Sequence, residues 1–218
     1  MQRLMGSDAG MLYQEQLPHQ PLHTVKVLVV DPGPGTTPAS LAAVVAERAR
    51  HVEPLRWQPV DVPAHLFHPV WRSVDPVPEH HVEVVELGSP DQRGLEAEVS
   101  RLASDPLERD RPLWHATIAH GLADDRLAVI LRLHHAIADG GSSVRILTQL
   151  ADSDAEPDRR TAPAEEPPGR ATLAADAARD LGRAVAGLPG LAARTGRAIS
   201  TGRVHSQAAA VDPVRGRL

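Results

Sequence analysis

The sequence predicts an α/β protein, because segments with the periodicity of strands alternate with segments that have the periodicity of amphipathic helices. Of its 218 residues 42% are hydrophobic and 23% are charged, so the chain can bury the core of one sizeable domain or two small ones. It contains no cysteine, which excludes disulfide bonds, thiolate metal sites and a cysteine nucleophile.

Caps, turns and apolar runs predict the elements of the N-terminal part. A short helix begins at Ser7, and a strand follows over residues 24–30. Valine and leucine occupy both faces of that strand, so we expect it to be buried on both sides. Residues 31–35 form a turn, and Thr37 caps a helix whose first residue is Pro38.

Strands and helices continue to alternate up to residue 150. His80 and His81, at the start of one of these strands, are expected at a solvated surface. The predicted elements are a strand over 81–87, a helix over 91–104, strands over 114–119 and 127–133 joined by a turn over 121–125, and a helix after Gly140 and Gly141.

Composition divides the chain into four parts. Residues 1–150 form the α/β lobe, and residues 151–169 are an acidic, proline-rich linker. Residues 170–204 are a basic amphipathic helical segment, expected to be interrupted by Gly-Leu-Pro-Gly at 187–190, and residues 205–218 are a tail. We find no internal repeat.

Charge and aromatic content exclude other classes of protein. The formal net charge of −5 and the small aromatic content, 2%, argue against nucleic-acid binding. No apolar run reaches the roughly 18 residues that span a bilayer, and the N-terminus lacks the pattern of a signal peptide. We therefore expect a cytoplasmic protein.

The residues best suited to chemistry lie between His134 and Gly140, directly after an apolar strand. A loop at the end of such a strand is a common place for reactive side chains. A histidine there can accept a proton near neutral pH, since its ordinary pKa is about 6.5. Asp139 can orient an imidazole or brace the loop, and Gly140 permits a tight turn.

Other interpretations of this loop remain open at this point. On spacing alone, a polar boundary at the end of a strand is about as common as a functional histidine pair. A metal site is disfavoured because the adjacent His134 and His135 point to opposite sides of an extended segment. Residues 140–144 do not form a nucleophile elbow, so direct transfer with histidine as general base is favoured over an acyl-enzyme.

His134 through Gly140 matches HHxxxDG, the signature shared by chloramphenicol acetyltransferases, peptide-synthetase condensation domains and bacterial wax ester synthase/diacylglycerol acyltransferases. The opening segment over 4–13 and the segment over 106–114, which ends in Pro-Leu-Trp, resemble the last of these families most. The resemblance covers residues 4 to about 150. It implies the N-terminal lobe of a two-lobed, chloramphenicol-acetyltransferase-like fold, with a mixed sheet, flanking helices and a helical tail.

The resemblance also implies roles for individual residues. His135 carries over as the catalytic base, His134 as a supporting residue, and Asp139, with Gly140, as a structural part of the loop. The Pro112-Leu113-Trp114 segment would shape the pocket, although Trp114 is equally well placed to be core at the start of a strand. A competing acyltransferase motif, histidine-x4-aspartate, would make His134 the base instead.

The implied reaction moves a fatty acyl group from acyl-CoA, as co-substrate, to diacylglycerol or a long-chain alcohol. We expect no metal and no further cofactor. The family continues into a second lobe, so either this chain is part of a longer product or a separate C-terminal lobe is its partner. The alternative is a non-catalytic lobe that binds a lipid surface or an acyltransferase. The basic helical segment further suggests peripheral attachment to the inner face of the plasma membrane or to lipid droplets.

Overall fold

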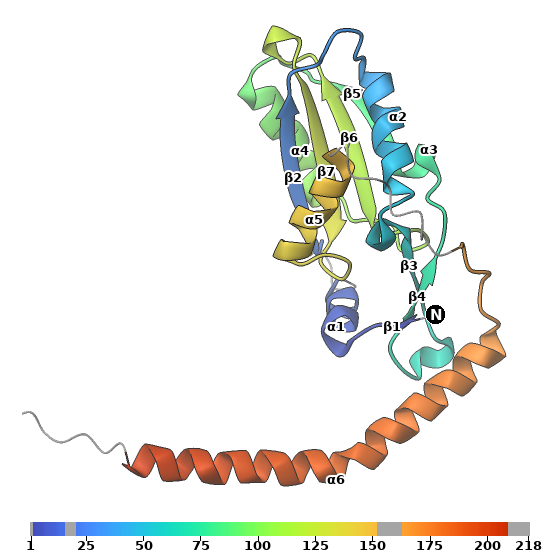
Figure 1. Cartoon of the computed structure of the whole chain (residues 1–218), viewed down its shortest axis with the longest axis vertical. Helices are drawn as coiled ribbons and strands as arrows, with labels where there is room; N and C mark the ends of the chain where they lie inside the picture. Colours follow the sequence, from blue (N-terminus) through green and yellow to red (C-terminus); the bar gives the residue numbers. More distant parts are fainter. Residues whose placement is uncertain (1, 16–20, 152–162, 209–218) are drawn as a thin grey trace, which may run out of the picture.

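The computed structural model describes the backbone of residues 2–15, 21–151 and 163–208. Its main feature is a four-stranded sheet with the strand order β2–β7–β6–β5 (Figure 1). The strands are β2 (His23–Val30), β5 (Val82–Glu86), β6 (Trp114–His120) and β7 (Leu127–His134). β2, β7 and β6 are antiparallel, whereas β5 and β6 are parallel, so the sheet is mixed as expected.

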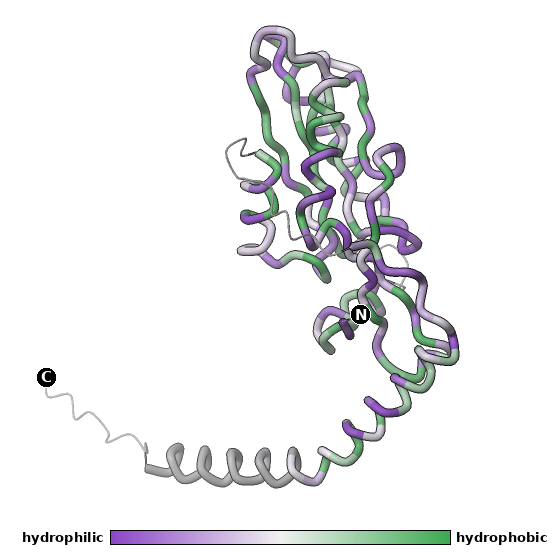
Figure 2. The backbone as a smooth tube through the Cα atoms, turned by 45° about the vertical axis from the view of Figure 1, so that its right-hand side comes forward, coloured by the Kyte–Doolittle hydropathy of each residue, from purple (hydrophilic) through white to green (hydrophobic). Residues whose placement is uncertain are grey.

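Helices cover both faces of this sheet. On one face, α2 (Pro38–Ala49) and α5 (Gly140–Ala151) pack over a core that includes Leu131 and Leu133. On the other face, α4 (Gln92–Ser104) packs over Ala128 and Ile130. Alternate residues of β7 therefore serve two cores, and Figure 2 colours the strands largely hydrophobic.

The start of α2 follows from its sequence. The hydroxyl of Thr37 accepts a hydrogen bond from the amide of Ser40 at 3.1 Å, and the hydroxyl of Ser40 accepts one from the amide of Thr37 at 2.8 Å. Pro38 follows at the first helical position, where its missing N–H costs nothing. The predicted cap is confirmed.

The strand over 24–30 is present as β2, but the expectation that it is buried on both faces is wrong. Val27 and Val29 are 41% and 46% exposed. In the described part of the chain β2 pairs with β7 alone, so it is an edge strand, and α4 covers part of its face. Apolar composition alone does not distinguish an edge strand from a central one.

A second, smaller sheet was not predicted. It contains three strands in the order β1–β4–β3. Each strand is short and β3 contains Pro59, which weakens a strand pattern in the sequence. Trp57 of β3 and Trp71 of β4 stack with ring centroids 5.9 Å apart. The bounds are β1 (Gln2–Arg3), β3 (Trp57–Val60) and β4 (Val70–Ser73), with helix α1 (Gly6–Gln14) following β1.

Several short helical segments complete the lobe. They are α3 (Pro78–His81) and the 3₁₀ turns η1 (Glu53–Arg56), η2 (Pro63–His65) and η3 (Ala123–Asp125). The expectation that His81 lies at a solvated surface is wrong: its side chain is 1% exposed, because α3 places it against Trp114. Burial lowers the pKa of His81 to about 4.

Helix α6 (Arg170–Ala208) leads away from the lobe and bends along its length (Figure 1). The expected interruption at 187–190 is absent, because Pro189 lies inside a continuous helix. A proline removes one hydrogen bond and kinks a helix, and at an exposed site water can satisfy the freed carbonyl. Four residues of the predicted tail are thus helical; residues 209–218, and residues 152–162 of the predicted linker, lie outside the described chain.

The first turns of α6 pack on the lobe. Leu173 and Ala177 are buried, and Asp180 pairs with Arg3 at 2.5 Å. Farther along the same face of α6, apolar side chains are exposed. Figure 2 shows short hydrophobic and hydrophilic segments that alternate along this helix. No helix in the described part of the chain is both long enough and apolar enough to span a membrane.

Candidate active site

The histidine pair lies at the carboxyl end of β7, where the chain turns into α5. His134 is the last residue of the strand and pairs with His23 of β2. The amides of Ile137 and Ala138 donate to the carbonyl of His134 at 3.1 and 3.3 Å, which folds the loop into a tight turn. The two histidines are therefore held at the junction of a central strand and a helix.

Asp139 fixes the other end of this loop. Its Oδ1 accepts a hydrogen bond from the amide of Ser142 at 2.7 Å, and its carbonyl accepts one from the hydroxyl of Ser143, also at 2.7 Å. Hydrogen bonds from Ser142 hold the pKa of Asp139 below its usual value. The carboxylate is exposed and caps α5, a position that braces the loop from its helical end.

His134 is completely buried, and both of its ring nitrogens have partners. Nδ1 accepts a hydrogen bond from the amide of Ala136 at 3.0 Å. Nε2 lies 3.2 Å from Oε2 of Glu15. Because Nδ1 accepts, Nε2 carries the proton and donates it to the carboxylate. A ring held in this way has no free lone pair for a substrate.

Glu15 is a site residue that sequence reasoning missed. Its Oε1 accepts a hydrogen bond from the amide of Leu22 at 3.1 Å, so one carboxylate holds both the start of β2 and His134. Burial acts to raise the pKa of Glu15, but the hydrogen bonds from His134 and Leu22 outweigh it and the pKa is lowered. The only sequence signal is an acid after an amphipathic helix, which is typical of any solvated helix end.

His135 has the opposite surroundings. Its amide donates to the carbonyl of Leu22 at 2.9 Å, which fixes its backbone beside β2. Its side chain is partly exposed, and the ring makes no hydrogen bond or ion pair with any described residue. His134 is the last residue of β7 and its ring is buried, whereas His135 is the first residue of the turn that follows and its ring is partly exposed.

The Pro-Leu-Trp segment lies next to the histidine pair through the backbone. The carbonyl of Leu113 accepts the amide of His134 at 3.0 Å, while the side chain of Leu113 is buried in the core. Trp114 is 2% exposed and donates its indole N–H to the carbonyl of Leu55 at 2.7 Å. Pro112 and Trp114 also line a pocket of about 210 Å³.

A second pocket, of about 320 Å³, adjoins the histidine loop. Ile137 and Ser142 contribute to it from the loop and from α5, and Trp57 contributes from β3. Its lining includes residues that follow His135 in the loop, but not His135 itself. Among the described residues, no three histidine, aspartate or glutamate side chains cluster in a way that could hold a metal ion.

Comparison with known proteins gives one family. A family model described as the wax ester synthase/diacylglycerol acyltransferase catalytic domain matches residues 4–216. A protein of Mycobacterium tuberculosis H37Rv, assigned by name as a diacylglycerol O-acyltransferase, is 38% identical over 192 residues. That alignment covers 84% of this chain and 41% of the relative, so the chain spans about two fifths of the relative's length.

Solved structures share the fold. The wax ester synthase/diacylglycerol acyltransferase of Marinobacter aquaeolei VT8 superposes with a TM-score of 0.59 at 27% identity, over 68% of this chain and 36% of that one. A variant of the starter condensation domain of the rhizomide synthetase RzmA, in complex with C8-CoA, has a TM-score of 0.57 at 19% identity, over 69% and 34% of the two chains.

Proposed function

Because the chain belongs to the wax ester synthase/diacylglycerol acyltransferase catalytic-domain family, we propose that it carries the general base of an O-acyl transfer. The donor is a fatty acyl-CoA, and the acceptor is diacylglycerol or a long-chain alcohol. The observation that carries this proposal is the contrast between two adjacent imidazoles. His134 is saturated with protein partners, whereas the ring of His135 is left for a substrate.

In the proposed mechanism His135 removes the proton from the acceptor hydroxyl as its oxygen attacks the thioester carbonyl. A new ester bond forms, the C–S bond breaks, and CoA leaves as a thiolate. A thiol with an ordinary pKa of about 8.5 is a good leaving group. The imidazolium then returns its proton to the thiolate, which regenerates the base and balances the reaction.

The competing assignment, with His134 as base, fits the geometry less well. To act as a base, His134 would have to give up its hydrogen bond from Ala136 or its contact with Glu15. Both partners are buried, so the lost bonds would not be replaced by water. We therefore assign His134 and Asp139 to positioning of the loop and His135 to proton transfer.

A second half of the enzyme is part of this proposal. The chain matches 41% of its mycobacterial relative and 36% of the Marinobacter enzyme. Positioning of two substrates is worth about 7–11 kcal/mol, more than a general base contributes. We infer that efficient transfer needs a second lobe. The C8-CoA held by a protein of the same fold supports an acyl-CoA donor.

One observation favours the alternative, a non-catalytic lobe that binds a lipid surface. Leu181, Val185 and Leu188 of α6 are 40%, 56% and 56% exposed and lie on one stripe. A stripe of this kind suits an interfacial helix. Attachment to a membrane or lipid droplet is also compatible with the catalytic proposal, since its acceptor is a lipid.

Acyl transfer from radiolabelled oleoyl-CoA to dioleoylglycerol tests the proposal. The chain is assayed alone, and after co-expression with the C-terminal half of a mycobacterial relative. We expect labelled triacylglycerol at a much higher rate in the co-expressed sample. No product in either sample, from protein shown to be folded, contradicts catalysis and favours the lipid-surface alternative. Equal rates in both samples contradict the need for a second lobe.

A further inference from the structure

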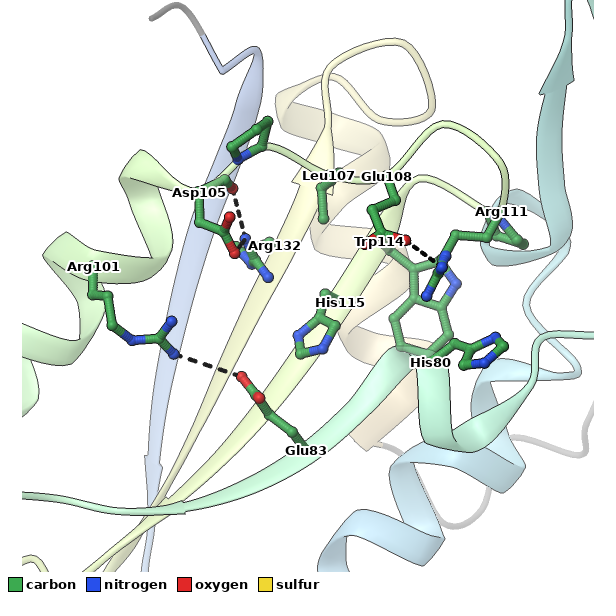
Figure 3. Close-up of a pocket in the computed structure, with 12 residues that line it drawn as sticks. His80, Glu83, Arg101, Asp105, Leu107, Glu108, Arg111, Trp114, His115 and Arg132 are labelled. Carbon is green, nitrogen blue, oxygen red and sulfur yellow. Dashed lines mark hydrogen bonds and ion pairs between the residues drawn. The ribbon is translucent and has the colours of Figure 1, made fainter.

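The pocket of about 210 Å³ beside Trp114 has a floor that the acyl-transfer proposal does not use (Figure 3). It lies between the C-terminal end of α4, the segment that follows α4, and the face of the sheet that α4 covers. Arg132 of β7 and His115 of β6 meet there, because they are paired across the two strands. Arg132 lies two residues before His134 on the same strand, so its side chain is on the same face.

Arg132 is buried, with 5% of its surface exposed, and its guanidinium is only partly satisfied. Nη1 donates to the carbonyl of Leu102 at 3.3 Å, and to the carbonyl and Oδ2 of Asp105 at 2.7 and 3.3 Å. Nε is buried and has no acceptor in the described part of the chain. A buried donor without an acceptor is costly, and the Nε–Nη2 edge of arginine matches the geometry of an oxyanion.

His115 adds a second unmatched group to the floor. Its Nδ1 is buried and has no hydrogen-bond partner among the described residues. Burial, and then the charge of Arg132, lower the pKa of His115. The neutral ring has one N–H, which it can turn to an acceptor that also binds Arg132. Figure 3 shows both side chains directed into the pocket.

The rim of the pocket carries more charge, but it is already paired. Arg101 forms an ion pair with Glu98 at 2.6 Å and lies 3.8 Å from Glu83, and Arg111 pairs with both Glu108 and Asp110. Glu83 also accepts a hydrogen bond from the hydroxyl of Thr117 at 2.8 Å. The side chains of Glu83, Asp105 and Glu108 are 41%, 56% and 65% exposed. The carboxylates of Glu83 and Glu108 thus lie toward solvent, whereas that of Asp105 reaches Arg132 at the floor, beside the unmatched donors.

We propose that this pocket binds a phosphate group, with the Nε–Nη2 edge of Arg132 and the ring of His115 as its donors. Arg101 and Arg111 add positive charge at the rim. On binding, each gives up part of its contact with carboxylates and contacts the phosphate instead. A fatty carboxylate fits less well, because charged side chains ring the opening through which its hydrocarbon chain would leave. The source is either inorganic phosphate or the phosphate of a coenzyme; only the coenzyme source rests on the function proposed above.

Calorimetric titration of the full chain with inorganic phosphate, at an ionic strength held constant with chloride, tests the site. We expect saturable binding. Arg101→Gln and Arg111→Gln should each weaken it roughly tenfold, as expected for loss of a charge-assisted contact. Arg93→Gln, an exposed change on the same helix outside this pocket, should leave it unchanged. Arg132→Gln should abolish phosphate binding. If Arg132→Gln fails to fold, the two rim variants still test the site.

The proposal is overturned if phosphate does not bind saturably, or if Arg93→Gln weakens phosphate binding as much as the rim variants do. Either result assigns the unmatched donors to water. Titrations with CoA and dephospho-CoA then identify the source. Tighter binding of CoA that is lost in Arg111→Gln assigns the site to the 3′-phosphate. If the two coenzymes bind equally and inorganic phosphate binds saturably, the site is assigned to the free ion. Because these titrations measure binding without turnover, failure of acyl transfer and failure of this site are distinguishable.

Discussion

The carboxylate of Glu15 lies 3.2 Å from Nε2 of His134, although the two residues are 119 positions apart in the chain. This contact joins the end of α1 to the end of β7 and fixes the tautomer of the imidazole. The other carboxylate oxygen holds the amide of Leu22, whose carbonyl in turn holds the amide of His135. Through these bonds one buried acid positions both histidines of the loop.

Replacing Glu15 by alanine should therefore lower the stability of the lobe. The change leaves the buried Nε2–H of His134 and the amide of Leu22 without acceptors, at a cost of about 3 kcal/mol. Urea denaturation followed by circular dichroism measures the free energy of unfolding. The matched control is Glu47→Ala, whose side chain is 65% exposed and should cost less than about 0.5 kcal/mol.

The same contact predicts a pH dependence. The pKa of Glu15 is lowered from 4.5 on folding. Its contribution to the free energy of unfolding is therefore complete above pH 4.5 and is lost as the pH falls through the lowered pKa. The difference in stability between the wild-type chain and Glu15→Ala should thus shrink as the pH is taken below 4.5. A difference that stays constant down to the acid transition, or an alanine variant as stable as the control, contradicts the role assigned to Glu15.

His81 predicts a second pH dependence, at higher pH. Its pKa falls from 6.5 to about 4 on folding, so between these values the unfolded chain binds a proton that the folded chain does not. Stability should therefore decrease as the pH falls from 6.5 to 4, with a slope of up to about 1.4 kcal/mol per pH unit. In His81→Gln this part of the slope should disappear. Equal slopes in both proteins, measured by urea denaturation, contradict the burial of a neutral imidazole.

Patterns local in sequence predicted much of the fold. The cap at Thr37, the helix after Asp91 and the strand that ends at the histidine pair are confirmed, because each depends on neighbouring residues. The mixed α/β class and the family were also recognised from sequence. His134 and His135 differ in burial, but His135 lies in the turn after β7, so the expected extended segment ends one residue earlier than the sequence suggested.

Features that depend on distant contacts were not accessible from the sequence. Glu15 acquires its role only when α1 meets β7, and Val27 is exposed only because β2 is an edge strand. The small sheet forms from strands too short to show a period, one of them with Pro59. His81 is buried because α3 turns it onto Trp114, which no local pattern indicates.

Substitution of Gly94 tests how closely α4 packs against the turn that precedes it. A Cβ atom at this position would lie 2.1 Å from the carbonyl oxygen of Ser89, a backbone atom that cannot move without displacing the turn. Gly94→Ala should destabilise the lobe by about 1–3 kcal/mol, despite the higher helix propensity of alanine. Gly182→Ala in α6, where nothing lies within 4 Å, should be neutral or stabilising. The reverse order in thermal denaturation contradicts this packing.

The exposed stripe of α6 predicts binding to lipid. Substituting Leu181, Val185 and Leu188 by serine should reduce flotation of the chain with anionic vesicles, because apolar burial drives interfacial binding. A control with Ala175→Ser and Ala186→Ser, both exposed and off the stripe, should float like the wild-type chain. If the triple variant floats as well as this control, the stripe does not bind lipid and packs against protein instead.

The rate of acyl transfer after substitution of His135 tests the central claim most directly. The chain is co-expressed with a second lobe and assayed with oleoyl-CoA and dioleoylglycerol. His135→Ala should lower the rate by about 10²–10⁴-fold while leaving the free energy of unfolding nearly unchanged, since the ring has no described partner. His120→Ala, at the far end of β6, should keep full activity. Full activity in His135→Ala, with loss only in a folded His134→Ala, would show that the other imidazole is the base.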